Sequence, residues 1–507
     1  MKIERTKNAT KNIIFGMILK IYQVIVPFLM RTALIHFLGL EYVGLNGLFT
    51  SILQVLNLAE LGVGSAMIFS MYKPIANDDN KTICALINLY KKYYRIIGLV
   101  IFILGMMLCP IIPLLIKKDL PEGLNIYVLY ILNLSATAFS YWLFAYKNSL
   151  LKAHQRDDVI SKITLVVNTL QYLLQFFVIV FFKNYYLYVI IILISQIITN
   201  IVTAIVSTKI YPKYKAIGKL DKKEIKKINQ KVKDLFIAKV GGIIIYSIDS
   251  IIISAFLGLT ILGIYQNYYY ILTALIGIID VIFNSCTAGM GNSLIVETKE
   301  KNYKDLRKFT FLIMTIASIC SAELLCLYQP FMEWWVGKEF LVNLDTVILL
   351  CLYFFIYEEN KVLCTYKDAA GIWHSDRFRP LIIAIVNLIL DFTLVNIIGI
   401  AGVLLATVIS IGLIGFPWLL IICFKEIFKT SPKEYLMDIF EYVVVTIIIS
   451  LITYNITKFL TGITIILLIL RAIIVLVISI FIIFIFFRKK EVFADSLELV
   501  KRILKLK

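Results

Sequence analysis

The chain has 507 residues, of which 60% are hydrophobic and 17% are charged, and its mean hydropathy is +0.88. Soluble globular proteins are about half apolar and about a quarter charged, so this composition excludes that class. Apolar runs of about 20 residues or more predict a protein that crosses the membrane many times. Unbroken runs such as residues 463–470 lack the alternation of a β-barrel, so we expect an all-α fold.

About 14 apolar segments follow one another as predicted membrane helices. The first six lie near residues 12–37, 42–71, 96–116, 126–146, 159–182 and 186–208. The next six lie near 235–257, 264–290, 309–328, 346–366, 381–398 and 402–424, and two more lie near 436–456 and 463–487.

These segments predict two parallel six-helix lobes with two extra helices at the C-terminal end. The predicted boundaries are an N-lobe at 1–208, a basic cytoplasmic linker at 209–234, a C-lobe at 235–430, the extra helices at 431–490 and a tail at 491–507. The tail places Phe493, Leu497, Val500 and Leu504 on one side of a helix. We expect it to be an amphipathic helix on the inner leaflet.

The net charge of +18 comes from 51 Lys and Arg against 33 Asp and Glu. Most of the basic residues lie in alternate loops and at the two ends, and by the positive-inside rule this predicts cytoplasmic termini. Orientation and contact with anionic lipid account for the excess, so we predict no nucleic-acid partner. The eight Cys lack ligand spacing and the three His are dispersed, which predicts no metal site.

One stretch of the chain occurs twice. Residues 16–46 return without a gap at 235–265, so that Lys20 corresponds to Lys239 and both copies share the pattern FLGLxxxG. Internal repeats of this length are typical of secondary transporters, in which two similar bundles flank a central site. The repeat therefore predicts a transporter.

Charged residues inside apolar segments are the strongest functional signal, because an unpaired charge in hydrocarbon costs several kcal/mol. In the first segment, Lys20, Gln23, Pro27 and Arg31 share one helix face. We predict that Lys20, Arg31 and Lys239 line a cavity and bind an anionic substrate. The alternative for the two lysines is that they extend to the nearby inner interface.

Three acids are predicted to couple transport to an ion or to pair between the lobes. Glu60 and Asp280 occupy nearly equivalent positions in the second and eighth segments, and Asp249 lies one position from the counterpart of Arg31. We expect Asp249 to meet Arg31 across the lobe interface. The alternative for Glu60 and Asp280 is ion pairing within a lobe, without a role in transport. Other charged residues inside the predicted membrane segments, for which no partner is predicted, are Glu323, Glu358, Glu359, Asp391 and Arg471.

Residues 20–76 resemble the N-terminal region of bacterial polysaccharide and O-antigen flippases of the Wzx type. These belong to the multidrug/oligosaccharidyl-lipid/polysaccharide exporter superfamily. Weaker similarity lies in LKAHQR (151–156), EWWVGKEF (333–340) and GIAGVLLATVIS (399–410).

The resemblance implies a carrier in the bacterial cytoplasmic membrane that turns undecaprenyl-diphosphate-linked oligosaccharides from the inner to the outer leaflet by alternating access. The pathway would be capsule, O-antigen or exopolysaccharide biosynthesis. A cationic cavity would hold the diphosphate, and Lys20, Arg31 and Lys239 would supply its donors. The implied partners are the lipid-linked oligosaccharide, the bilayer, and a polysaccharide polymerase and glycosyltransferases.

No GxxxxGK[ST] pattern occurs, so we predict no nucleotide cofactor and expect coupling to a gradient of H⁺ or Na⁺. The remaining alternatives are a flippase for a peptidoglycan precursor or teichoic acid, and an ion-coupled drug antiporter of the same superfamily. A membrane enzyme is a third, but the short outer loops lack the paired acids of a catalytic platform. We therefore predict no catalytic residues.

Overall fold

The structure, a computed structural model, describes residues 5–503. Within this range, its description leaves out the side chains of residues 5–10, 13, 238, 239, 246, 288 and 499–503. Every regular element in the described range is a helix.

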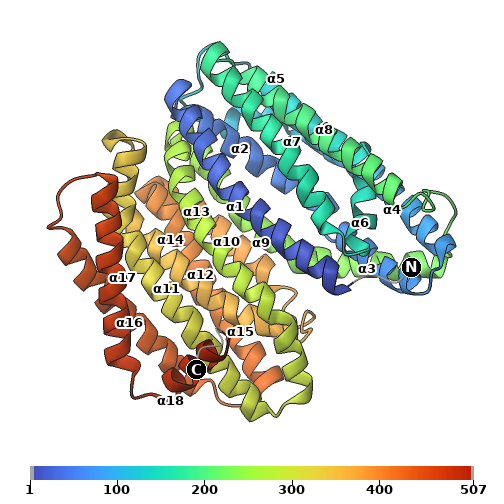
Figure 1. Ribbon diagram of the computed structural model, residues 1–507. Coiled ribbons are helices and arrows are strands. Elements are labelled where there is room, and N and C mark those ends of the chain that lie inside the picture. The colour runs from blue at the N-terminus through green and yellow to red at the C-terminus, as the bar shows by residue number, and fades with distance from the viewer. Residues whose placement is uncertain (1–4, 504–507) are drawn as a thin grey trace. The chain divides into compact units, whose positions relative to one another are not determined.

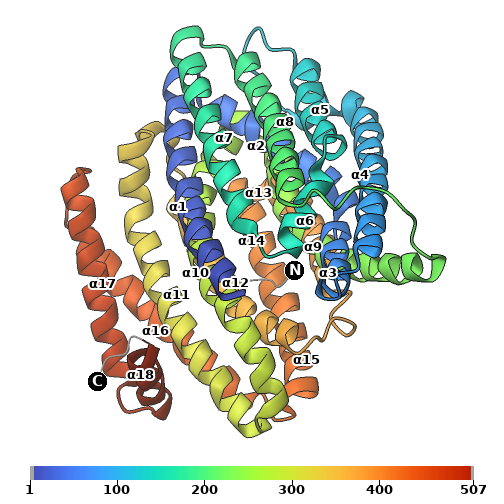
Figure 2. The same cartoon turned by 45° about the vertical axis from the view of Figure 1, so that its right-hand side comes forward.

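The chain folds into two compact units, Met1–Gly263 and Ile264–Lys507. The helices of the first unit are α1 (Arg5–Phe37), α2 (Leu40–Leu56), α3 (Val63–Ala76), α4 (Asn80–Leu108), α5 (Ile126–Trp142), α6 (Asn148–Ala153), α7 (Asp157–Phe177), α8 (Tyr185–Ile210), α9 (Lys222–Leu257) and the first turn of α10 (Leu259–Val296). Helices α1, α7, α8, α5 and α4 are successive neighbours (Figures 1 and 2). Helix α9 packs against α2 and α3, so it belongs to the core of the first unit.

Up to residue 503, the second unit holds the rest of α10 and eight further helices. These are α11 (Lys299–Trp335), α12 (Leu344–Ala369), α13 (Arg379–Ile398), α14 (Ile400–Ile409), α15 (Phe416–Ile422), α16 (Lys433–Thr457), α17 (Ile465–Phe487) and α18 (Glu491–Ile503). Helices α17, α16, α11, α12 and α14 are successive neighbours, and α13 packs on α14. One π-helical segment, Ser410–Gly415, joins α14 to α15, and a second, Cys423–Phe428, continues α15 to the end of the span Ile400–Phe428.

Twelve helical segments of the described chain are long and apolar enough to cross a membrane, and a bent pair of helices makes a thirteenth. The predicted all-α, polytopic membrane fold is thus confirmed. The predicted segment 346–366 does form α12, but Glu358, Glu359 and Lys361 interrupt its apolar run. The bent pair is α5 with residues 145–153, which turn by 48° after Trp142.

The two copies of the repeat have the same local structure. Gly39 ends α1 with φ +125°, and the corresponding Gly258 ends α9 with φ +106°. Such positive φ values strain residues that carry a β-carbon, which explains why both copies use glycine at this turn.

The helices that follow these two turns touch each other within the first unit. A β-carbon on Gly44 of α2 would overlap the carbonyl oxygen of Leu259, and one on Gly263 of α10 would lie 2.5 Å from the carbonyl oxygen of Leu40. Gly44 corresponds to Gly263 and Leu40 to Leu259 in the repeat. The starts of α2 and α10 therefore make one reciprocal backbone contact through two equivalent glycines.

Helix α18 packs on α11. The ring of Phe493 lies against Phe311 of α11 and Phe484 of α17, with ring centroids 6.0 Å apart in both pairs. Leu497 is 48% exposed, and the side chains of Val500 and Leu504 lie outside the described residues. The position of this helix on the inner leaflet stays a prediction.

Candidate functional site

The predicted cavity residues on α1 differ in their surroundings. Lys20 is exposed, and Arg31, about three turns later, is half-buried. Tyr188 of α8 lies within electrostatic range of the Arg31 guanidinium. The side chain of Lys239 lies outside the described residues. Binding of an anionic substrate by these three residues stays a prediction.

Glu60 lies at a break in a membrane span. The span Leu40–Ala76 is interrupted by a 3₁₀ turn, Asn57–Glu60, before α3 begins. A carboxylate oxygen of Glu60 accepts a hydrogen bond from the hydroxyl of Tyr94 (3.1 Å), which accepts one from Tyr90 (2.5 Å). Hydroxyl donors of α4 therefore offset part of the cost of placing this carboxylate in an apolar span. Its part in ion coupling stays a prediction.

Asp249 is 5% exposed on α9. Near it, Ser247 donates a hydrogen bond to the side chain of Gln54 on α2 (3.2 Å), and Ser254 donates one to the carbonyl oxygen of Leu115 (2.6 Å). Polar side chains thus hold this part of α9 inside the first unit. The approach of Asp249 to Arg31 stays a hypothesis.

Asp280 forms an ion pair that the repeat did not suggest. Its carboxylate on α10 lies 3.0 Å from the ammonium group of Lys361 on α12, and both side chains are about one-third exposed. The sequence does not predict Lys361 as the partner of Asp280, because the pair joins helices far apart along the chain. The only signal was the EENK pattern at 358–361, which places Glu358 and Lys361 on one helix face.

Glu358 lies beside this ion pair. It is 1% exposed, neither of its carboxylate oxygens has a hydrogen-bond partner among the described residues, and both Asp280 and Lys361 lie within electrostatic range. Two acidic side chains therefore lie near one lysine inside the second unit, and Asp280 alone forms an ion pair with it. A site with one more acid than base gains stability when it takes up a proton or a small cation.

A second polar group lies between α13 and α14. The amide of Asn387 donates a hydrogen bond to the hydroxyl of Thr407 (3.1 Å), and Asp391 is fully buried one turn after Asn387. Within the described residues, no three His, Cys, Asp or Glu side chains are grouped as metal ligands. The polar group therefore offers amide, hydroxyl and carboxylate oxygens rather than a cluster of acids.

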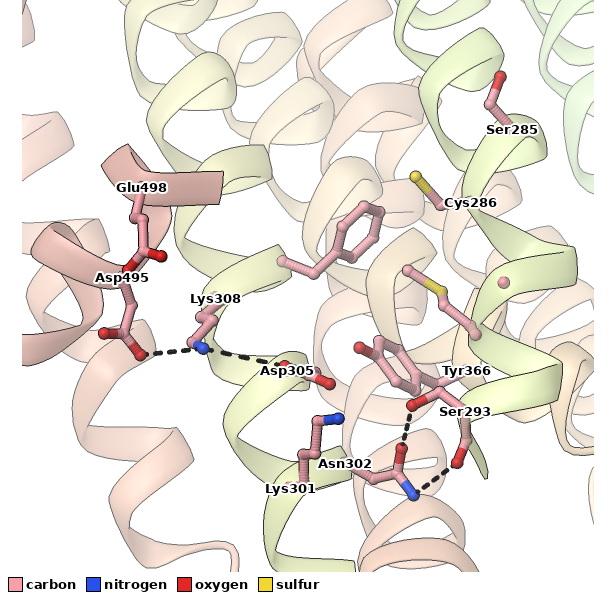
Figure 3. A pocket seen from close by; sticks show the side chains of 13 residues that line it. Ser285, Cys286, Ser293, Lys301, Asn302, Asp305, Lys308, Tyr366, Asp495 and Glu498 are labelled. Carbon is pink, nitrogen blue, oxygen red and sulfur yellow. Dashed lines mark hydrogen bonds and ion pairs between the residues drawn. The ribbon is translucent and has the colours of Figure 1, made fainter. Parts of the chain in front are cut away.

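The second unit also contains a pocket of about 510 Å³ (Figure 3). Helices α10, α11, α12 and α18 supply its walls. Its lining residues are Ser285, Cys286, Gly289, Met290, Ser293, Lys301, Asn302, Asp305, Lys308, Phe309, Tyr366, Asp495 and Glu498. Figure 3 shows the acids of α18 on one side and the small side chains of α10 on the other.

The charges of this pocket nearly balance. Lys308 lies 2.9 Å from Asp495 and 3.9 Å from Asp305, and Lys301 forms an ion pair with Glu297 (2.6 Å). Because each lysine has an acidic neighbour, the pocket does not offer the excess positive charge that a diphosphate requires. We therefore do not place the predicted anion site there.

Comparisons with known proteins agree with this architecture. A family model described as a polysaccharide biosynthesis protein matches residues 9–287. No curated protein sequence matches the chain.

Several solved structures are similar to the chain. One is the lipid II flippase MurJ in an inward closed conformation, with 17% identity, a TM-score of 0.71, and coverage of 94% of this chain and 99% of that one. An inward-facing multidrug resistance MATE family transporter of the MOP superfamily has 13% identity, a TM-score of 0.59 and coverage of 78% and 93%. A MOP superfamily transporter from Pyrococcus furiosus has 12% identity, a TM-score of 0.53 and coverage of 82% and 94%. At these identities the structural matches establish the fold alone.

Proposed function

Because the chain belongs to the polysaccharide biosynthesis protein family, we propose that it is a flippase for undecaprenyl-diphosphate-linked oligosaccharides. It would act in the bacterial cytoplasmic membrane with both termini in the cytoplasm. The pathway would be capsule, O-antigen or exopolysaccharide biosynthesis, with a polymerase and glycosyltransferases as partners. The similarity of its fold to a lipid flippase supports transport of a lipid-linked cargo.

The observation that carries the proposal is Arg31. It is a permanently charged, half-buried side chain in the apolar span Ile14–Phe37. A guanidinium binds phosphate oxygens in a bidentate manner, and it does so most strongly where water is scarce. A carrier of diphosphate lipids needs such a donor inside the membrane.

The first experiment measures the leaflet distribution of lipid-linked oligosaccharide in cells with and without this protein. We expect undecaprenyl-linked units to accumulate on the cytoplasmic face without it. The wild type should relieve this accumulation, and Arg31→Ala of equal abundance should not. If Arg31→Ala also relieves the accumulation, the flippase function stands and Arg31 has a structural role. If no lipid-linked oligosaccharide accumulates in cells without the protein, the proposal is contradicted.

Ion coupling is the second part of the proposal. We assign it to Glu358 and the Asp280–Lys361 pair, because a buried acid beside an ion pair changes its charge state when a proton or Na⁺ binds. Glu60 and Asp249 are further candidates. In proteoliposomes, collapse of the H⁺ or Na⁺ gradient should stop transport by the wild type, and Glu358→Gln should lose the dependence on that gradient. An unchanged dependence in Glu358→Gln would exclude this residue.

A peptidoglycan precursor is the main alternative cargo, since the similar MurJ structure is that of a lipid II flippase. The leaflet assay distinguishes the two when it is repeated with labelled lipid II. A teichoic-acid precursor can be tested in the same way. An ion-coupled drug antiporter, the alternative that the MATE fold suggests, would instead lower the accumulation of cationic drugs in cells.

A further inference from the structure

A group of basic side chains in the first unit lies apart from the residues discussed so far. Lys91 and Arg95 lie one turn apart on α4, and Lys147 lies in the 3₁₀ turn between α5 and α6. We call these three residues the basic cluster. None of them belongs to the repeat or to the predicted cavity.

The ring of Tyr146 holds the cluster together. The ammonium group of Lys91 lies 5.9 Å from the centroid of this ring, and Arg95 lies within electrostatic range of its hydroxyl. Lys147, the next residue, is within electrostatic range of Lys91. The ring thus accepts Lys91 on its face, and the charges of Arg95 and Lys147 lie within electrostatic range of this pair.

The local fold fixes these positions. The indole of Trp142 donates a hydrogen bond to the carbonyl oxygen of Arg95 (3.1 Å), and Ser207 of α8 donates one to the carbonyl oxygen of Lys147 (3.4 Å). Phe144, with φ +63°, makes the turn that directs residues 145–147 toward α4. The cluster is therefore a product of the bend after α5, and it does not consist of lysines on a uniform surface.

The cluster has no acidic counterpart. Among the described residues, no carboxylate lies within ion-pair distance of Lys91, Arg95 or Lys147.

The loop that follows α8 adds more positive charge beside this face of α4. The carbonyl oxygen of Lys213 in this loop accepts a hydrogen bond from the thiol of Cys84, and that of Gly218 accepts one from the side-chain amide of Asn88. Cys84, Asn88 and Lys91 are spaced so that they lie on one side of α4.

The ammonium group of Lys147 is accessible although most of its side chain is not. Lys147 is 9% exposed as a residue, and its nitrogen forms no hydrogen bond among the described residues yet stays open to the surface. An anion at this position would offset the repulsion between Lys147 and Lys91.

The sequence pattern predicts that the cluster lies at the level of the lipid phosphates. Arg95 is the last charged residue before the apolar stretch 96–116, so it marks the boundary between the headgroup region and the hydrocarbon. Its end of the unit is the one that the charge pattern predicts to face the cytoplasm. Lys and Arg at this depth contact the phosphates of the inner leaflet.

We infer that Lys91, Arg95 and Lys147 bind the phosphate group of a lipid headgroup at the inner leaflet. Two lipids offer this chemistry, namely an anionic phospholipid and the diphosphate of a polyprenyl-linked cargo. For the second lipid, the inference rests on the proposed function, and the cluster would be the place where cargo first binds.

The test measures lipid retention by the purified full-length protein in detergent, using native mass spectrometry over a range of lipid concentrations. The probes are phosphatidylglycerol and undecaprenyl diphosphate, with phosphatidylcholine as the zwitterionic reference. The test variant is Lys91→Gln/Arg95→Gln/Lys147→Gln. The matched control is Lys222→Gln/Lys223→Gln/Lys226→Gln, which removes the same three charges from the exposed start of α9.

We expect the test variant to weaken retention of the preferred lipid about tenfold or more, as the loss of charge-assisted hydrogen bonds predicts. The control should change it by less than about twofold. The double variant Lys91→Gln/Arg95→Gln leaves the buried Lys147 in place, and it replaces the triple variant if that protein does not fold. A preference for undecaprenyl diphosphate would identify the cargo, and a preference for phosphatidylglycerol would identify a membrane phospholipid.

Two results would overturn the inference. One is that neither anionic lipid is retained more than phosphatidylcholine, and the other is that the control loses as much retention as the test variant. Failure of the proposed function looks different. If the protein retains lipid at this cluster but moves no oligosaccharide in the leaflet assay, the lipid site is supported and the flippase function is contradicted.

Discussion

His154 lies outside the membrane spans, in the loop after α6, where it is 4% exposed and packs against Tyr211 and Tyr214. Its Nδ1 lies 2.8 Å from the carbonyl oxygen of Leu150, to which it donates when that nitrogen carries the proton. Burial lowers the pKa of this imidazole below its ordinary value of 6.5. At neutral pH the folded protein therefore holds a neutral ring.

This ring predicts a pH dependence of stability. The unfolded chain binds a proton at His154 near pH 6.5, whereas the folded chain binds it only at lower pH, so stability falls as the pH drops through this range. We expect the apparent Tm in detergent to fall more between about pH 7.5 and about pH 5.5 in the wild type than in His154→Gln. Parallel pH profiles for the two proteins would contradict this account.

The Asp280–Lys361 ion pair gives a second prediction about single residues. Lys361→Met leaves Asp280 beside the buried Glu358 without a counter-ion, so we expect a lower apparent Tm. Asp280→Asn/Lys361→Met should regain most of the loss, with a coupling energy of about 1 to 3 kcal/mol in a double-mutant cycle. Thermal unfolding of the four proteins measures it, and strictly additive effects would mean that the two side chains do not interact.

At the scale of elements, α18 is held by contacts to two membrane helices. Phe493 packs between α11 and α17, and Glu491 and Asp495 form ion pairs with Lys304 (3.5 Å) and Lys308 (2.9 Å) of α11. Exposed ion pairs add little, so the aromatic contact supplies most of the attachment. An amphipathic pattern in sequence does not distinguish such a docked helix from one that lies on lipid.

We expect Phe493→Ala to speed amide hydrogen exchange throughout α18, because the loss of the ring contact makes local opening easier. Hydrogen–deuterium exchange with mass spectrometry measures this for peptides that cover 491–503. Leu497→Ala is the matched control, since Leu497 is 48% exposed, and it should leave exchange unchanged. Equal exchange in the Phe493 variant and the wild type would show that other contacts hold the helix.

At the scale of the whole molecule, most of the helices could be predicted because a membrane span is a local feature of sequence. The segments predicted at 436–456 and 463–487 agree with α16 and α17 within a few residues. The resemblance read from residues 20–76 is confirmed, since that stretch lies inside the family match at 9–287.

The sites were harder to predict, because their partners come from distant parts of the chain. Lys361 of α12 forms an ion pair with Asp280 of α10, and the hydrogen-bond donor to Glu60 comes from α4. The internal repeat shows which residues of its two copies correspond to each other. Corresponding residues need not be in contact, so the repeat does not predict ion pairs or hydrogen bonds. The walls of the pocket come from four helices that are separated along the chain. A local sequence pattern cannot predict such a pocket.

The paired glycines at the starts of α2 and α10 yield a prediction about the whole chain. Gly44→Ala and Gly263→Ala each force the same two helices apart, so each should lower the amount of folded protein in size-exclusion chromatography. The double variant should lose less than the sum, because one displacement makes room for both methyl groups. Gly16→Ala, where a β-carbon meets nothing within 4 Å, is the control. Additive losses would mean that the two contacts are independent.

The reciprocity of that contact has the form of a symmetric interface. Leu40 meets Gly263 and Leu259 meets Gly44, which is the pattern of an interface between two identical subunits related by a two-fold axis. Within one polypeptide, the same pattern lets two copies of one sequence pack against each other, so that a side chain at either glycine would displace both helices.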